Sequence, residues 1–218
     1  MKKKTLTIAI ALVLVVALAV GATYALLTDK TEAVKNTFVV GKIRGEDTVF
    51  SLKEHAIDSQ DATGKYVLKH GNAESDYTTS NTYGAVVPGV NIPKDPTVKV
   101  DKLAGDAYLY VVVDNQLGAG LTYEMADKWT KLADADNGAK TLYVYNAGEK
   151  LTPTSPAISQ NILKDDQIAV ATKGVADGST TLTFNAYLVQ AVGTGNAADA
   201  WNAAAPVAGF TAKMPTGA

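Results

Sequence analysis

Apolar and polar residues alternate along several short stretches of this sequence, and this period of two constrains the fold more than any other feature. Within residues 181–188, Leu182, Phe184, Ala186 and Leu188 share one face of an extended chain. Such alternation is typical of β-strands with one buried face. Residues 107–113 are instead apolar on both faces and rich in β-branched side chains, which predicts a central strand covered on both sides.

The same reasoning extends to the rest of the chain. Residues 141–145 alternate, with Leu142 and Val144 opposite Tyr143 and Tyr145. Turn-forming pairs such as Asp114-Asn115 and Asn137-Gly138 punctuate the sequence. Many short strands separated by turns predict a mainly β fold, a two-sheet antiparallel sandwich spanning residues 26–205. Further strands are expected at residues 38–44, 97–100, 121–125 and 168–172. Residues 46–81 are polar, and we expect a long loop or insertion there.

One short helix is expected near the C-terminus. Asn196 is a suitable N-cap, the Ala-rich residues 197–205 favour helix, and Pro206 ends it. Trp201 is expected to pin this helix onto a sheet. Residues 206–218 are small and polar, so we expect a loose tail.

The first 25 residues have the three parts of a secretory signal peptide: a positive end, an apolar middle and a small-residue exit. Thr23 and Ala25 are the small pair of the exit, which predicts cleavage after Ala25 and Leu26 as the mature N-terminus. The alternative is a retained anchor, because residues 6–27 carry no charge and are numerous enough to span a bilayer as an apolar helix. The expected location is therefore secreted, in the extracellular matrix or at the cell surface, with membrane contact only through an uncleaved leader.

Composition excludes several classes of function. The chain has no Cys, which removes disulfides, thiolate catalysis and cysteine-ligated zinc. It has 20 Lys and Arg against 22 Asp and Glu, and three of the lysines lie in the leader, so residues 26–218 carry a net charge of −5. A mildly acidic protein lacks the basic surface that phosphate backbones require, so we expect no nucleic-acid partner.

The leader contains Gly21, Thr23, Tyr24 and Ala25, and it is followed by Asp29, Asn36, Phe38 and Gly41. This pattern resembles the start of the TasA/camelysin family, which comprises exported surface and biofilm matrix proteins of Gram-positive bacteria. Body segments at 87–89, 95–98, 108–113, 129–132, 184–190 and 197–203 also resemble the wider group. The resemblance implies a jelly-roll sandwich and cleavage by a signal peptidase of the SipW type.

The resemblance also implies that the N-terminal segment of the mature chain acts as a donor strand, completing the sheet of the next subunit. The donor residues would be Leu26, Leu27, Asp29, Asn36 and Phe38. Such a head-to-tail contact does not close and would propagate as a fibre. The alternative is that residues 37–43 pair within their own domain, and both hold if only residues 26–36 are donated.

No residue pattern indicates catalysis, a metal site or a cofactor. Glu54-His55 has no second His at zinc-protease spacing, so His55 and His70 are interpreted as surface residues. A Ser-His-Asp triad would assemble only in space, and no nucleophile-elbow motif points to one. Residues 134–138 lack the bidentate Glu of a calcium loop and fit an acidic hairpin turn. The tyrosines at 108, 110, 143 and 145 suit sheet packing better than carbohydrate stacking.

The sequence therefore favours a non-enzymatic structural protein of the cell surface or biofilm matrix that self-associates into fibres. Two alternatives remain open: a camelysin-like surface metalloprotease and a monomeric surface adhesion module.

Overall fold

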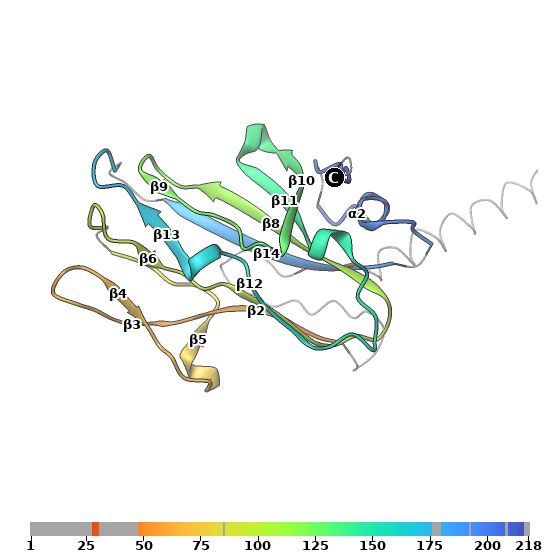
Figure 1. Cartoon of the computed structure of the whole chain (residues 1–218), viewed down its shortest axis with the longest axis horizontal. Helices are drawn as coiled ribbons and strands as arrows, with labels where there is room; N and C mark the ends of the chain where they lie inside the picture. The colour runs from red at the N-terminus through yellow and green to blue at the C-terminus, as the bar shows by residue number, and fades with distance from the viewer. Residues whose placement is uncertain are drawn as a thin grey trace, which may run out of the picture.

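The computed structural model describes residues 28–30, 48–84, 86–175, 180–191, 193–207 and 209–215. Over these residues the protein is mainly β, and the strands are arranged in antiparallel sheets, as predicted (Figure 1). The leader lies outside the described residues, as do Thr23, Ala25, Leu26, Leu27, Asn36, Phe38 and the strand expected at 38–44. None of the helices described is long and apolar enough to span a membrane.

The larger sheet has five antiparallel strands. From one edge to the other they are β1 (Thr28–Lys30), β14 (Thr181–Gln190), β8 (Ala107–Gln116), β11 (Lys140–Tyr145) and β10 (Trp129–Ala135). The prediction of a central strand is confirmed, because β8 pairs with β14 on one side and β11 on the other, and its first seven residues are buried. The turn expected at Asp114-Asn115 is wrong, since β8 continues through both residues.

A second, four-stranded sheet has the order β12 (Ile158–Asn161), β7 (Thr97–Lys102), β2 (Val49–His55) and β5 (Tyr77–Thr78). Two smaller groups extend this layer: β6 (Ile92–Pro93), β13 (Gln167–Val170) and β9 (Leu121–Thr122), and the hairpin of β3 (Ile57–Gln60) with β4 (Tyr66–Leu68). Short 3₁₀ turns are η1 (Glu74–Asp76), η2 (Asp136–Gly138), η3 (Asn146–Gly148) and η4 (Lys164–Asp166).

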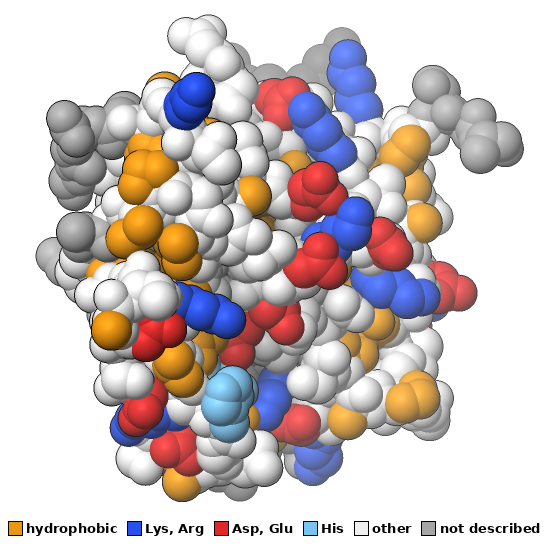
Figure 2. All heavy atoms as spheres, turned by 60° about the vertical axis from the view of Figure 1, so that its left-hand side comes forward, with side chains coloured by type: hydrophobic (Ala, Val, Ile, Leu, Met, Phe, Trp, Pro, Cys, Tyr) orange, Lys and Arg blue, Asp and Glu red, His pale blue; other side chains and the backbone are white. Residues whose placement is uncertain are grey.

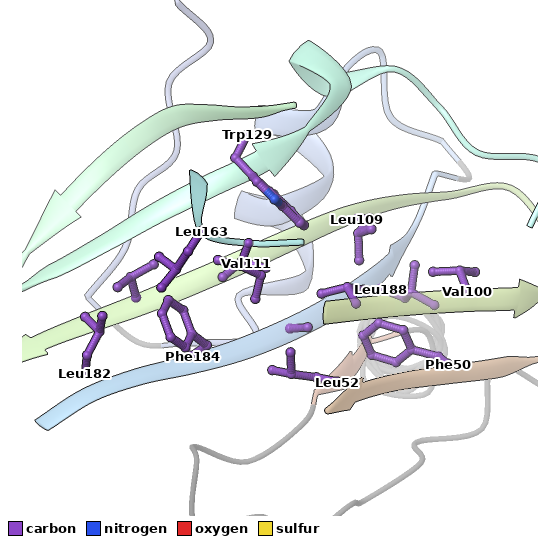
Figure 3. Close-up of a cluster of buried hydrophobic side chains, with 14 of the residues drawn as sticks. Phe50, Leu52, Val100, Leu109, Val111, Trp129, Leu163, Leu182, Phe184 and Leu188 are labelled. Carbon is purple, nitrogen blue, oxygen red and sulfur yellow. The ribbon is translucent and has the colours of Figure 1, made fainter. Parts of the chain in front are cut away.

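The main core lies between the two sheets (Figure 3). Phe50 and Leu52 of β2 pack in one cluster with Phe184 and Leu188 of β14, all at most 5% exposed, so the alternation predicted for 181–188 is confirmed. Trp129 of β10 closes one side of this core. Apolar area removed from water on this scale is the dominant stabilising term of a sandwich.

The opposite face of the larger sheet is covered by the helix α2 (Ala197–Ala204). Asn196 caps it as predicted, because its side chain accepts a hydrogen bond from the Asp199 amide at 2.9 Å. Trp201 is fully buried and its ring lies 5.0 Å from that of Tyr110 and 5.4 Å from that of Tyr187. The prediction that Trp201 pins the helix to the sheet is confirmed.

The structure corrects the expectation of a long loop or insertion at residues 46–81. This segment contains β2, β3, β4 and β5, and β2 is an integral strand of the second sheet. Phe50, Leu52 and Glu54 alternate inward along β2. The pattern was obscured because the third inward position carries a carboxylate.

The expected loose tail is also corrected for the part that the structure describes. Phe210 and Ala212 are buried against the α2 side of the larger sheet. Asn202 holds this segment through two hydrogen bonds to the backbone of Ala212, at 2.8 and 3.1 Å. The tail therefore completes the second core instead of extending into solvent.

Candidate functional site

The outer edge of β14 is the place where a predicted functional segment meets the described fold. β1 pairs antiparallel with it, and Thr28, Asp29 and Lys30 lie opposite Val189, Leu188 and Tyr187. Asp29 is thus the one proposed donor residue that the structure describes. The remaining proposed donor residues lie outside the described part of the chain.

Only one end of this edge has a described partner. β14 has ten residues, all paired with β8 on its inner side. On its outer side, no strand of the described residues pairs with positions 181–185. Backbone groups along an unpaired edge can accept a further strand.

A cavity of about 330 Å³ lies beside this part of β14. Its walls come from Thr181–Thr183 of β14, from residues 80–84, and from a group of apolar side chains on nearby strands and loops. The apolar group comprises Val86, Ile92, Leu117, Leu121, Ile168 and Leu182. The cavity therefore combines a strand edge, a polar rim and an apolar wall.

An ion pair between Glu54 and Lys94 lies at the inner side of this cavity. The Lys94 Nζ donates to Glu54 Oε2 at 2.8 Å, and the Lys94 and Glu54 side chains are 5% and 3% exposed. Lys94 lines the cavity. The other carboxylate oxygen of Glu54 accepts a hydrogen bond from the backbone N–H of Asn81 at 3.1 Å. Glu54 lies at an inward position of β2, and Lys94 directly follows β6. A charge pair therefore occupies two buried positions at which apolar side chains would be expected.

Two aromatic rings lie close to the Lys94 ammonium. Its Nζ lies 5.9 Å from the ring centroids of both Tyr83 and Phe184, within cation–π range. The Tyr83 hydroxyl donates to the Pro93 carbonyl at 2.6 Å, which fixes the ring. Burial, and secondarily the charge of Glu54, raise the pKa of Tyr83, so this phenol stays neutral.

His55 follows Glu54 in the sequence, but its side chain contacts other residues, Asp95 and Tyr77. Its Nδ1 lies 2.5 Å from Asp95 Oδ2, and its ring stacks on Tyr77 with a centroid distance of 4.4 Å. The expectation of a surface residue holds for the exposed His70, whereas His55 is half-buried in this contact. Burial raises the pKa of the nearby Asp166, and the Asn161 amide donating to it at 2.6 Å opposes that shift.

The other candidate chemistries are placed as follows. Tyr108 and Tyr110 are buried in the α2-side core, and Tyr143 and Tyr145 pack against the main core, which confirms sheet packing. The expected hairpin turn between β10 and β11 is present at Asp136–Gly138, whereas Asp134 and Ala135 are the last residues of β10. Within the described ranges, no three His, Cys, Asp or Glu side chains are placed to hold a metal ion.

The surface shown in Figure 2 carries acidic and basic side chains intermingled, with hydrophobic side chains between them. This view faces the end of the molecule at which β9, β13 and the β3–β4 hairpin lie. A mixed surface offers no single-sign field on this face to steer a strongly charged partner.

Fold and site together define a mainly β protein of antiparallel sheets, in which part of the β14 edge has no partner among the described residues. Compared with known proteins, the chain matches no family model, no curated protein and no solved structure. Its functional interpretation therefore rests on its own residues and geometry.

Sequence reasoning located the segment that reaches the edge, but it missed the cavity and the Glu54–Lys94 pair. Their one sequence signal was a charged residue at an inward position of each of two alternating stretches, 50–54 and 92–100.

Proposed function

We propose that this protein is a secreted structural component of the bacterial cell surface or biofilm matrix. In this proposal it has a jelly-roll sandwich and assembles into fibres by addition of its N-terminal segment to the sheet of the next subunit. A signal peptidase of the SipW type would release that segment, and the assembled partner would be a second copy of the chain.

The observation that carries the proposal is the pairing of β1 with β14. β1 begins three residues after the expected cleavage site at Ala25, and it already occupies the edge that a donor strand would use. An identical segment from a neighbour can make the same backbone hydrogen bonds, because strand pairing depends on the main chain. The described part of this contact within one chain is three residues long, so its exchange for an intermolecular contact costs little.

Among the described residues, the outer edge of β14 beyond β1 is open to a longer strand. Positions 181–185 lack a partner among the described strands, so a longer incoming segment would gain pairs that β1 does not make. Each contact joins the N-terminal segment of one subunit to the β14 edge of the next, and repetition of this contact gives an open filament.

The two alternatives have less support. No described group of side chains is arranged to hold a metal, so no observation favours a surface metalloprotease. A monomeric adhesion module needs no exposed N-terminal strand, and the position of β1 would then have no role beyond its own domain.

The test compares the 26–218 protein with a form that begins at residue 37. We expect fibres of the first by negative-stain electron microscopy and monodisperse particles of the second, with equal β content by circular dichroism. A matched control keeps residues 26–36 in a scrambled order and should assemble poorly. Fibres from the shortened form at an unchanged rate would refute donor-strand addition.

A further inference from the structure

Lys94 has hydrogen-bonding capacity that the described protein does not use. An ammonium group has three N–H donors, and the contact to Glu54 is the one hydrogen bond that its side chain makes within the described residues. With 5% exposure, the group is almost removed from solvent. Buried polar groups are normally satisfied, and the adjoining cavity is where the remaining donors can meet an acceptor.

The charge of the site restricts that acceptor. Glu54 already neutralises Lys94, so a ligand carboxylate would meet a nearby negative charge and a ligand ammonium would meet a positive one. A neutral oxygen acceptor suits the site best, because it satisfies an N–H without adding an uncompensated buried charge.

The walls around Lys94 restrict the rest of the ligand. Ile92, Leu121 and Ile168 offer an apolar surface, whereas Ser80 and Thr82 carry hydroxyls at the rim. The edge of β14 at Thr181–Thr183 adds backbone N–H and C=O groups. The cavity volume of about 330 Å³ is at the small end of the range of ligand pockets, so the cavity has room for one small molecule or for one unit of a larger one.

We propose that this cavity binds an N-acetylated amino sugar, as a terminal unit of a surface or matrix glycan. The acetamido carbonyl accepts from Lys94, the acetyl methyl group packs on the apolar wall, and the sugar hydroxyls bond to the rim and the β14 edge. Its use of Thr181–Thr183 overlaps the positions with which an extended donor strand would pair, so sugar binding and full extension of that strand are alternatives at this edge.

The experiment measures binding of N-acetylglucosamine, glucose and glucosamine to the 26–218 protein by saturation-transfer NMR and by amide shifts of the labelled protein. N-acetylglucosamine should bind, with shifts at Lys94 and Leu182, and glucosamine should not, because its ammonium faces Lys94. Glucose, which lacks the acetamido group, should bind more weakly. The double variant Glu54→Gln/Lys94→Met should weaken N-acetylglucosamine binding about tenfold or more, the effect expected for losing a hydrogen bond from a charged donor.

Lys164→Met provides the matched control, because Lys164 is exposed and lies outside the cavity. It should bind N-acetylglucosamine as the unaltered protein does. Absence of binding, binding unchanged in the folded double variant, or equal binding of glucosamine would overturn the proposal. If no sugar binds, and a peptide of residues 26–36 instead shifts the amide signals of Lys94 and Leu182, the cavity belongs to the incoming strand.

Discussion

Removing one partner of the Glu54–Lys94 pair should destabilise the protein far more than removing both. The two side chains are 3% and 5% exposed and their charged atoms are 2.8 Å apart. Breaking a buried pair leaves one uncompensated charge and typically costs about 3–5 kcal/mol, whereas replacing the whole pair with uncharged residues is often nearly neutral. At about 2–4 °C per kcal/mol for a domain of this size, Lys94→Met should lower the Tm by about 6–20 °C.

The measurement is urea unfolding followed by tryptophan fluorescence, using Trp129 and Trp201, together with thermal scans by circular dichroism. We expect Glu54→Gln and Lys94→Met each to lower the free energy of unfolding by several kcal/mol. The double variant should recover most of this loss, because the glutamine amide at position 54 keeps an oxygen for the Asn81 N–H and no buried charge remains.

Lys131→Met is the control, because its ion pair with Asp134 is 56% and 42% exposed. Its unfolding midpoint should change little. If the double variant is as unstable as the sum of the two single variants, the residues are not coupled and the argument from a desolvated pair is wrong.

The remaining predictions concern the α2-side core. Trp201→Ala should cost about 3–5 kcal/mol in unfolding free energy, measured by urea titration, since Trp201 is fully buried; a loss below about 1 kcal/mol would contradict the packing. Deleting residues 206–218 should raise the fluorescence of the dye ANS and lower the Tm, because Phe210 no longer covers Trp201; unchanged values would mean that the tail is loose after all. Burial raises the pKa of Tyr187 to about 12, above its ordinary value of 10, so the neutral form is preferred in the fold. Stability should therefore hold below pH 10 and fall as the pH rises from 10 toward 12, and a spectrophotometric titration with every tyrosine ionising reversibly near pH 10 would refute this.

Strands with regular alternation could be predicted from the sequence, because burial on one face leaves a direct pattern. β14 was recognised in this way, whereas β8 was recognised from its continuous apolar run and the helix α2 from its N-cap, its alanines and Pro206. The turn misassigned at Asp114-Asn115 has a simple cause: both residues lie toward the less buried end of β8, where polar side chains are tolerated within a strand.

The strand β2 was missed because its burial depends on a contact with a residue distant in the sequence, which the local pattern does not show. Glu54 would be excluded from an inward position on its own, and it is acceptable there only because Lys94, forty residues later, neutralises it. The tail was missed for a related reason, since burial of Phe210 and Ala212 depends on a surface built by β14 and α2. No local pattern shows that such a surface exists.

The proposed assembly mechanism is tested most directly by electron microscopy of the 26–218 protein with an excess of a peptide of residues 26–36. The account predicts that the peptide shortens or abolishes fibres by occupying the outer edge of β14, while a scrambled peptide has no effect. Fibres of unchanged length and number in the presence of the matching peptide would contradict it.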